Sequence, residues 1–317
     1  MQEGIIYPKA LQAGDKISLI SPGFQVTAER LRMSLTRLDA MGFQSVVPKT
    51  LCNEDGYFAG HLEEKVNELH EAFVDPDVKA IMAVRGGYGS ARLLPHLDYD
   101  LIRDNPKIII GYSDITALLL GIHAQTGLVT FHGPSSGVPF TAFTRASFSQ
   151  TLCEAETCIY ENPTDVKNDL VPQYPTVTLQ PGQAVGRLIG GNLSVICSLV
   201  GTAYLPDDWD DVILFIEDLN EEAHRVDRML GQLQLAGILE RLQGIVIGSF
   251  KNCRASAYRS YTVEQIITRF VEPLGIPAYT GAMIGHQDDI FTVPIGARVV
   301  LDADRCLFGL MEPAVTD

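Results

Sequence analysis

The sequence is short of positive charge. Its 317 residues include 24 lysines and arginines against 39 aspartates and glutamates, which gives a formal net charge of −15 and an isoelectric point near 4.8. Nucleic acids and anionic membrane surfaces bind basic faces of proteins. We therefore expect neither as a partner, and an acidic substrate would need a local gathering of arginines.

Long apolar runs and export signals are also missing. No stretch approaches the roughly 18 apolar residues of a membrane-spanning helix. The opening "MQEGIIYPKALQAGDK" has no cationic segment followed by an apolar one. The six cysteines are scattered and form no C-x-x-C pair. We expect reduced, mostly buried thiols in a cytoplasmic protein.

Metal and phosphate motifs are absent as well. Neither H-E-x-x-H nor a Cys/His cluster occurs, and only "HQDD" at 286–289 offers His286, Asp288 and Asp289 as ligands for a metal-dependent hydrolase. The glycine-rich "RGGYGS" at 85–90 lacks the G-K-[ST] of a Walker A loop, and Arg92 stands where G-x-G-x-x-G needs its last glycine. We expect no metal and no cofactor.

What the first half does contain is an alternation of buried strands and amphipathic helices. Apolar strands are predicted within 16–22, 44–49, 78–90 and 106–114, with helices after Thr27 and over 63–75. Strands without polar alternation, separated by helices, indicate a parallel sheet covered on both faces. Functional loops of such sheets follow the carboxyl ends of the strands, which is where "RGGYGS" and "GYSD" lie.

The pattern changes after about residue 140. Turn residues and two proline-rich spots precede a second α/β region with helices over 221–235 and 262–275 and a buried strand over 244–250. We predict an N-terminal domain over residues 1–160, a linker over 161–182 and a C-terminal domain over 183–317.

Ser113 is the first candidate for chemistry. In "IIIGYSDITALLL" (108–120) it stands where a buried strand becomes a helix, a place that can expose a nucleophile beside backbone N–H groups. The segment matches only half of G-x-S-x-G, because Ile115 replaces the second glycine. A helix N-cap serine is the alternative interpretation.

A nucleophilic serine needs a base and an acid. His286 lies where an apolar segment becomes a polar loop, although six other histidines compete with it. Glu217 ends the buried strand "VILFIE", where an unpaired carboxylate would be costly. Asp218 follows on the opposite face of the strand, so only one of the two can point inward. An ion pair of Glu217 with Arg225 or Arg228 is the structural alternative.

The "RGGYGS" loop has two interpretations. Its glycines allow close backbone approach to a ligand, as in an oxyanion site, and Arg85 could meet a substrate carboxylate in bidentate fashion. Equally, the loop could be a structural turn.

Together these segments resemble the LD-carboxypeptidases of serine peptidase family S66. The resemblance runs from about residue 16 to about residue 302 through these blocks: "AVRGGYGSARLLPHLDYDLI", "IIIGYSDITALL", "GRLIGGNLSVICSLVGT", "ILFIEDLNEEAHRVDRMLGQLQLAGIL" and "GIVIGSF". It implies a flavodoxin-like N-terminal domain of the class I glutamine amidotransferase type and a smaller, β-rich α/β C-terminal domain.

The resemblance also implies a site. Ser113 takes the place of the nucleophile, Glu217 that of the acid and His286 that of the base, with the active site between the domains. Backbone N–H groups of Asp114 and Gly87 then form the oxyanion hole. Substrate binding is expected of the loop residues Arg85, Gly86 and Tyr88. Arg85, Arg92 or Arg187 could meet the acidic substrate, and no motif decides among these three.

The function implied is removal of the terminal D-alanine from murein tetrapeptides, after the L-centre of meso-diaminopimelate, in cytoplasmic peptidoglycan recycling. The partner is then a muropeptide, and the protein a homodimer. A second branch of the family hydrolyses the amide of microcin C-type peptide-nucleotides and is expected to be longer, with a loop whose aromatic side chain stacks on adenine. The compact chain and its single Trp209 favour the muropeptide branch.

A non-catalytic module is a hypothesis of a different class. An amidotransferase-like fold could bind a small acidic ligand at "RGGYGS" without doing chemistry. In that case Ser113, Glu217 and His286 need not meet in space.

Overall fold

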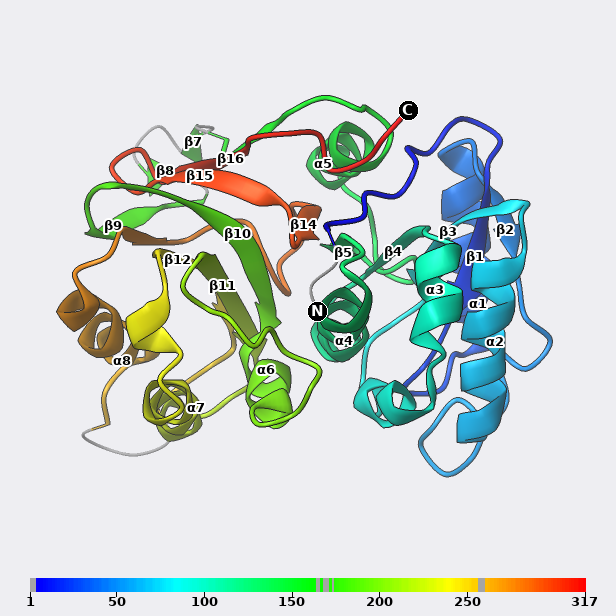
Figure 1. The fold of residues 1–317 in the computed structure, drawn as a ribbon, viewed down its shortest axis with the longest axis horizontal. Helices are drawn as coiled ribbons and strands as arrows, with labels where there is room; N and C mark the ends of the chain where they lie inside the picture. The colour runs from blue at the N-terminus through cyan, green and yellow to red at the C-terminus, as the bar shows by residue number, and fades with distance from the viewer. Residues whose placement is uncertain (1–3, 164–165, 168–170, 173, 256–259) are drawn as a thin grey trace.

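A computed structural model describes residues 4–163, 166–167, 171–172, 174–255 and 260–317. Within these ranges two large sheets lie side by side, each with helices packed on it (Figure 1). The first has six strands in the order β14-β5-β4-β3-β1-β2, and the second has eight in the order β6-β16-β15-β10-β11-β12-β13-β9. The predicted α/β class, with a parallel N-terminal sheet and a β-rich C-terminal part, is confirmed.

The first sheet is built from the apolar runs of the first half. Its strands pair in parallel except at the β5–β14 edge. Side chains on both faces are buried, as in β4, because helices cover the sheet. The strands are β1 (Lys16–Ile20), β2 (Gln44–Val46), β3 (Val78–Ala83), β4 (Ile108–Gly111), β5 (Thr130–His132) and β14 (Val293–Ile295). The helices of this part are α1 (Ala28–Ala40), α2 (Leu62–Val74), α3 (Tyr99–Asp104), α4 (Thr116–Thr126) and α5 (Ala142–Leu152).

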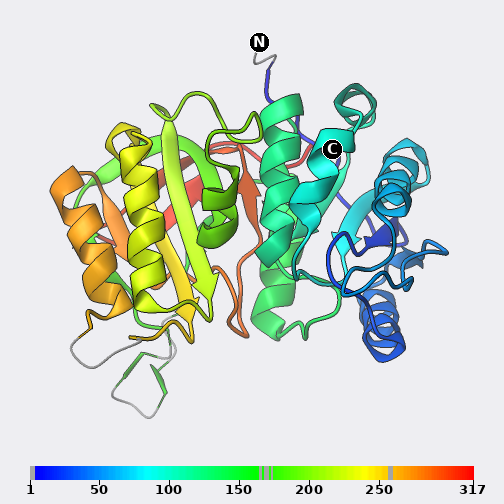
Figure 2. The same cartoon turned by 90° about the horizontal axis from the view of Figure 1, so that it is seen from below.

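The second sheet is parallel in its centre and antiparallel at its edges. Strands β10 to β13 run parallel, whereas β15, β16, β6 and β9 join in antiparallel fashion. Helices α7 and α8 pack side by side against it (Figure 2). The strands are β6 (Ile159–Glu161), β9 (Val177–Gln180), β10 (Gln183–Asn192), β11 (Val212–Leu219), β12 (Gly244–Lys251), β13 (Ala278–Thr280), β15 (Arg298–Asp302) and β16 (Leu307–Leu310). The helices are α6 (Leu193–Leu199), α7 (Ala223–Leu235) and α8 (Val263–Val271).

Short elements complete the chain. A separate hairpin pairs β7 (Val166–Lys167) with β8 (Val171–Pro172). The 3₁₀ helices are η1 (Ser90–His96), η2 (Ser113–Ile115), η3 (Leu239–Arg241) and η4 (Glu272–Leu274).

Predicted helix starts occur where the capping chemistry places them. The Thr27 hydroxyl accepts a hydrogen bond from the Arg30 N–H at 3.2 Å and begins α1. Thr262 and Gln265 form the capping box that begins α8. Each cap satisfies a backbone donor that the helix itself cannot pair.

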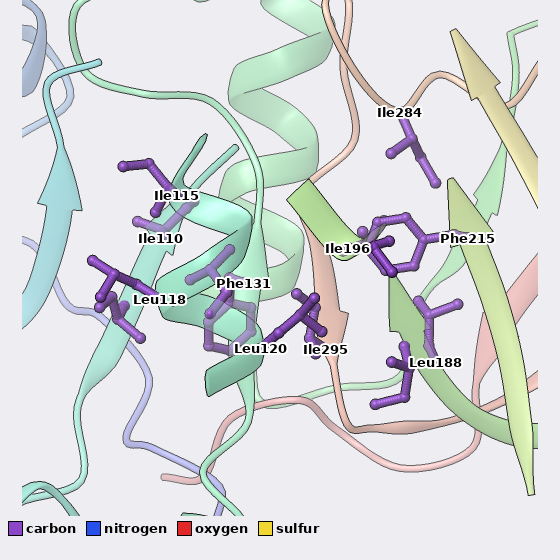
Figure 3. Packing of buried hydrophobic residues seen from close by; sticks show 14 of the residues in the cluster. Ile110, Ile115, Leu118, Leu120, Phe131, Leu188, Ile196, Phe215, Ile284 and Ile295 are labelled. Atoms are coloured by element: carbon purple, nitrogen blue, oxygen red, sulfur yellow. The ribbon is translucent and has the colours of Figure 1, made fainter. Parts of the chain in front are cut away.

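Strand β14 connects the two halves. It comes from the C-terminal part of the sequence but extends the first sheet beside β5. Ile295 of β14 lies next to Leu120, between Phe131 of the first half and Leu188 of the second (Figure 3). Helix α4 also contacts α6 and β10 across this junction. The start of α4 is therefore held against the second half of the chain.

The strand order departs from a simple division of the sequence into domains. The predicted linker at 161–182 contains β9, an edge strand of the second sheet, and β6 joins that sheet at its other edge. Strands β6 and β9 are too short to show a clear alternation of polar and apolar residues, so the sequence pattern does not distinguish them from the surrounding prolines and turn residues. The boundaries at residues 160 and 183 stay a prediction.

Of the helices in the described ranges, none combines the length and the apolar character that crossing a membrane requires.

Candidate active site

Ser113 occupies a strained turn between a buried strand and a helix. Its φ of +63° lies in the left-handed region, which residues with a Cβ rarely adopt. Such strain costs on the order of 1–3 kcal/mol and persists only where the surroundings hold the residue. Ser113 begins η2, while Tyr112 and Ile115 are the residues at the cap positions of η2 and α4. The N-cap interpretation of Ser113 therefore does not hold.

The side chain of Asp114 fixes this turn to the glycine-rich loop. Its buried carboxylate accepts hydrogen bonds from the N–H groups of Gly89 at 3.2 Å and Ser90 at 2.9 Å, and from the Ser90 hydroxyl at 2.6 Å. Because these bonds satisfy a buried charge, they tie the two loops into one unit. The Asp114 side chain therefore has a structural role at this turn.

The glycine-rich loop touches Ser113 through Gly86. A Cβ on Gly86 would lie 2.8 Å from the Cβ and 3.1 Å from the Oγ of Ser113. The next glycine, Gly87, has a φ of +139°, and a Cβ there would lie 2.5 Å from Cγ of Phe24. Side chains are excluded at both positions, so the loop brings bare backbone to the serine. The loop is thus a tight turn, and it lies against the candidate nucleophile.

Glu217 and His286 form a buried pair. Nδ1 of His286 lies 2.7 Å from Oε2 of Glu217, and the glutamate side chain is fully buried. Arg225, a sequence-based candidate partner for Glu217, instead pairs with Glu221 at 3.7 Å. The bond to Nδ1 leaves Nε2 of His286 for another partner. This is the arrangement by which a carboxylate orients a histidine base.

Gly285 makes room for the Glu217–His286 pair. It has a φ of +115°, and a Cβ at Gly285 would lie 2.7 Å from Oε2 of Glu217. The residue before the histidine must therefore be glycine, both for its backbone conformation and for the close approach of the carboxylate. The sequence "GH" carries this signal, but nothing in the sequence alone shows which carboxylate the glycine meets.

Asp218 points away from His286, as strand alternation predicts. Its carboxylate accepts hydrogen bonds from Nδ2 of Asn192 at 3.0 Å and from the N–H groups of Ser194 at 2.9 Å and Leu219 at 2.8 Å. Burial raises the pKa of Asp218 to about 6, and the negative charge of Glu217 acts in the same direction. Asp218 therefore supports the start of α6.

The two halves of the chain meet beside Ser113. The His286 ring lies 4.8 Å from the ring of Tyr112, the residue before the serine. The N–H of Asn192, at the end of β10, donates to the Thr116 hydroxyl at the start of α4, at 3.1 Å. Across the described ranges no hydrogen bond links Ser113 to His286 directly. Catalytic hydrogen bonds often tighten only when substrate is bound.

His132 is a residue of this region that the sequence did not single out as functional. It ends β5, is 1% exposed, and lies edge-on to Phe215 with ring centroids 5.3 Å apart. Burial lowers the pKa of His132 to about 4, so its ring is neutral at pH 7. Neither of its ring nitrogens nor Oε1 of Glu217 has a hydrogen-bond partner in the described part of the chain. The sequence signal that could have identified His132 is its position at the end of a strand, which pairs with Gly111 in the neighbouring strand.

The three predicted substrate-binding arginines lie in different surroundings. Arg85 is half-buried and donates to the carbonyls of Gly86 at 3.2 Å and Gln25 at 3.1 Å. Arg92 lies over the ring of Phe58 at 4.2 Å. Arg187, in the middle of β10, pairs with Asp211. It precedes Asn192 by five strand residues, about 16 Å along the strand.

Tyr88 stands at the outer side of the loop. Its side chain is 58% exposed and its ring stacks with Phe58 at a centroid distance of 6.3 Å. Tyr57, also more than half exposed, lies 6.1 Å from Tyr88. These rings form an accessible aromatic surface next to Gly87 and Gly89.

The proposed metal ligands have other partners. Asp289 accepts hydrogen bonds from the hydroxyls of Thr141 and Tyr174, and His286 faces Glu217. The described residues hold no group of three or more potential ligands arranged for a metal ion.

Comparison with known proteins identifies similar sequences over both halves. The family model of the LD-carboxypeptidase N-terminal domain matches residues 17–133, and that of the C-terminal domain matches residues 185–301. The first range contains Ser113 and the glycine-rich loop, and the second contains Glu217 and His286.

Individual relatives match almost end to end. A probable murein peptide carboxypeptidase of Bacillus subtilis (strain 168) is 38% identical over 93% of this chain and 91% of its own length. The microcin C7 self-immunity protein MccF of Escherichia coli is 32% identical over 95% of this chain and 94% of its own length. The expectation that the microcin branch is longer and carries an extra loop stays a prediction.

Solved structures of both kinds share the fold. MccF in complex with glutamyl sulfamoyl guanosine has a TM-score of 0.89 at 30% identity, over 98% of this chain and 99% of that chain. A muramoyltetrapeptide carboxypeptidase from Oxalobacter formigenes has a TM-score of 0.78 at 30% identity, over 93% and 97%.

Proposed function

The chain belongs to the LD-carboxypeptidase family, peptidase S66, and from this premise we propose that it is a serine carboxypeptidase that releases terminal D-alanine from murein tetrapeptides. The relatives named as murein peptide carboxypeptidases support the substrate class. The bond cleaved is the one between the L-centre of meso-diaminopimelate and D-alanine.

One observation carries the proposal of a serine mechanism. A fully buried glutamate holds a histidine at 2.7 Å, and that histidine packs against Tyr112, the neighbour of a serine in a strained turn. A binding module would have no need for this combination. The strain at Ser113 and the buried charge of Glu217 both cost stability, and a catalytic role is a reason to retain them.

In the proposed first step, Oγ of Ser113 attacks the carbonyl carbon of the scissile peptide bond. Nε2 of His286 takes the hydroxyl proton, and Glu217 stabilises the imidazolium that forms. The carbonyl oxygen becomes an oxyanion, for which the N–H groups of Asp114 and Gly87 are the proposed donors. Both donors belong to the unit that the Asp114 carboxylate ties together.

In the second step the tetrahedral intermediate collapses. The C–N bond breaks, His286 gives its proton to the leaving nitrogen, and D-alanine departs while the tripeptide stays esterified to Ser113. Water then attacks the ester with His286 again as the base, which releases the tripeptide and restores the serine. No cofactor takes part in this sequence.

The proposal extends to the setting of the enzyme. Removal of D-alanine from peptidoglycan fragments belongs to their recycling, and the proposed compartment is the cytoplasm, as the family resemblance implies. The same resemblance implies a homodimer. Light scattering of the purified protein would show a mass near twice that of the 34.7 kDa chain.

Hydrolysis of peptide-nucleotide amides is the second candidate, because the TM-score to MccF is the higher of the two reported above. Trp209 is 5% exposed and cannot stack on a nucleobase from solvent. In contrast, Tyr57 and Tyr88 are accessible beside the glycine-rich loop. The fold itself therefore serves both branches.

The test compares substrates on one enzyme preparation. L-Ala-γ-D-Glu-meso-diaminopimelate-D-Ala, the same peptide ending in L-Ala, and aspartyl sulfamoyl adenosine are each incubated with the protein, and kcat/KM is measured for each. We expect release of D-alanine, with the L-alanine peptide left uncut. Faster hydrolysis of the adenylate would transfer the proposal to the second branch, and equal rates on the two peptides would contradict the stereochemical assignment.

A further inference from the structure

Arg85 reaches the active site with part of its hydrogen-bonding capacity unused. Its Nε donates to the Gly86 carbonyl and Nη1 to the Gln25 carbonyl, and its guanidinium lies 5.3 Å from the centre of the Phe24 ring. A guanidinium carries five N–H donors, so three remain after these two bonds. Because Gly86 abuts Ser113, Arg85 is anchored directly beside the candidate nucleophile.

Arg30 is a second arginine next to the end of β3. It is in the first turn of α1, half-buried, and its stem packs so closely on Gly137 that a Cβ there would lie 2.9 Å from Cγ and Cδ of Arg30. The N–H of Gly137 bonds to the carbonyl of Val84, the residue before Arg85, at 3.0 Å. Both arginines thus adjoin the end of β3, Arg85 two residues after Ala83 and Arg30 through its contact with Gly137.

The positive charge of Arg30 shifts the pKa values of two residues next to Ser113, Arg85 and Tyr112. Burial is the main cause of the lowered pKa of Arg85, and the positive charge of Arg30 adds to it. Burial raises the pKa of Tyr112 to about 12, which Glu217 reinforces and Arg30 opposes. The charge of Arg30 therefore acts on Arg85 and on the tyrosine that precedes Ser113.

Neither arginine has a carboxylate partner among the described residues, although the chain carries a net charge of −15. Five other arginines do pair with aspartate or glutamate: Arg103, Arg187, Arg225, Arg241 and Arg298. Two adjacent, half-buried positive charges without a counter-ion are unfavourable by themselves. They suit a site whose counter-ion arrives with the ligand.

We propose that Arg30 and Arg85 together bind the C-terminal carboxylate of the peptide substrate, and that Arg30 makes the enzyme select a free carboxylate over a neutral terminus. This inference rests on the proposed carboxypeptidase function. It explains how a strongly acidic protein admits an anionic peptide end next to its nucleophile. Arg30 was not among the arginines that the sequence suggested, because a helical arginine in "AERLRMSL" carries no motif.

A matched control lies on the same helix. Arg32 follows Arg30 by two residues, so it projects about 200° around α1. It is exposed and lines a separate hollow of about 380 Å³ together with Arg37 and Arg145. Arg30→Gln and Arg32→Gln remove the same charge from the same helix, but only the first removes it from the active site.

The experiment measures kcat and KM for the wild type and both variants on two peptides. One is L-Ala-γ-D-Glu-meso-diaminopimelate-D-Ala with a free carboxylate, and the other is the same peptide with a C-terminal amide. We expect the wild type to prefer the free acid roughly 10- to 100-fold in kcat/KM, the usual effect of one charge-assisted hydrogen-bonding partner. Arg30→Gln should lose most of this preference, chiefly through a higher KM for the acid, while Arg32→Gln keeps it.

The outcomes separate the two claims. If the wild type cleaves neither peptide, the proposed function fails and the inference fails with it. If the wild type cleaves the acid and Arg30→Gln keeps the full preference, or loses activity equally on acid and amide, only the inference is overturned. Should Arg30→Gln not fold, as judged by circular dichroism, Arg30→Lys keeps the charge and stem, and we expect it to lower the preference without abolishing it. An unchanged preference in Arg30→Lys would then contradict the assignment.

Discussion

Nδ1 of His286 lies 2.7 Å from Oε2 of Glu217, although the two residues are 69 positions apart and come from different elements of the second half. Glu217 lies near the carboxyl end of the buried strand β11, and Gly285 leaves room for its carboxylate beside the histidine. Asp218, one residue further, bonds instead to Asn192 and to backbone N–H groups. Glu217 thus contacts His286, whereas the adjacent Asp218 stabilises the start of α6.

This difference predicts different effects of two isosteric substitutions. Glu217→Gln keeps the shape but removes the charge that orients His286 and offsets the imidazolium, so kcat on the tetrapeptide should fall by about 10⁴. Asp218→Asn should affect kcat much less and act mainly on stability, because it loses acceptors for the start of α6. Both variants are assayed on the same peptide, with circular dichroism as the check on folding. A larger loss of kcat in Asp218→Asn would mean that the acid is assigned one residue too early.

The contact between Gly86 and Ser113 predicts a second effect. Gly86→Ala places a methyl group 2.8 Å from the Cβ of Ser113, so the serine or the loop must shift. A displacement of about 1 Å at a reacting group lowers kcat by about 10². The fold should persist, because the loop remains tied to Asp114.

Gly231→Ala is the control for this substitution. Gly231 lies in α7, and a Cβ there would have Phe270 as its nearest neighbour at 3.9 Å. Alanine is the better helix former, so this variant should be fully active and as stable as the wild type or slightly more stable. If Gly86→Ala were as active as Gly231→Ala, the close approach of the loop to the serine would have no catalytic meaning.

Buried titratable groups predict how stability depends on pH. Burial lowers the pKa of His123 and of His132 to about 4. Between about pH 6.5 and pH 4 these two histidines are therefore protonated in the unfolded chain but neutral in the folded protein. Their effect lowers stability as the pH falls through this window. The raised pKa of Asp218, about 6, works in the opposite direction below pH 6 and offsets roughly one of the two histidines.

The net expectation is a protein that loses a few kcal/mol of unfolding free energy between pH 7 and pH 5 or below. Urea unfolding at pH 7.5, 6.0 and 5.0 measures this directly. His132→Asn should flatten the dependence, since one of the two uncharged rings is gone. Stability that stays constant or rises on acidification would show that these histidines are not held neutral.

Much of the fold was predictable because its strands and helices carry local signals. The isoleucines of β4 and the apolar run "VILFI" of β11 mark strands buried on both faces, and Thr27 and Thr262 mark helix starts. Strand β14 carried no such signal. It joins the first sheet by pairing with β5, which lies more than 150 residues earlier in the sequence. Neither segment alone indicates that the two strands pair.

The site was predictable where a residue follows a strand and only partly where it depends on distant contacts. Ser113, Glu217 and His286 stand at strand ends or in the loops after them, which is where chemistry gathers in α/β folds. Which of Arg85, Arg92 and Arg187 meets the substrate stays a prediction, because the sequence does not show where each side chain lies in the fold. The sequence did not single out Arg30 or His132, because a helical arginine and a histidine in a short strand carry no motif.

The most direct test of the account measures D-alanine released from L-Ala-γ-D-Glu-meso-diaminopimelate-D-Ala by the wild type and by Ser113→Ala at equal concentrations. Removal of a triad nucleophile lowers kcat by about 10⁶. The account predicts release by the wild type and none detectable from Ser113→Ala, with the circular dichroism spectra of the two proteins alike. Release of D-alanine at a similar rate by a folded Ser113→Ala protein would contradict the serine mechanism.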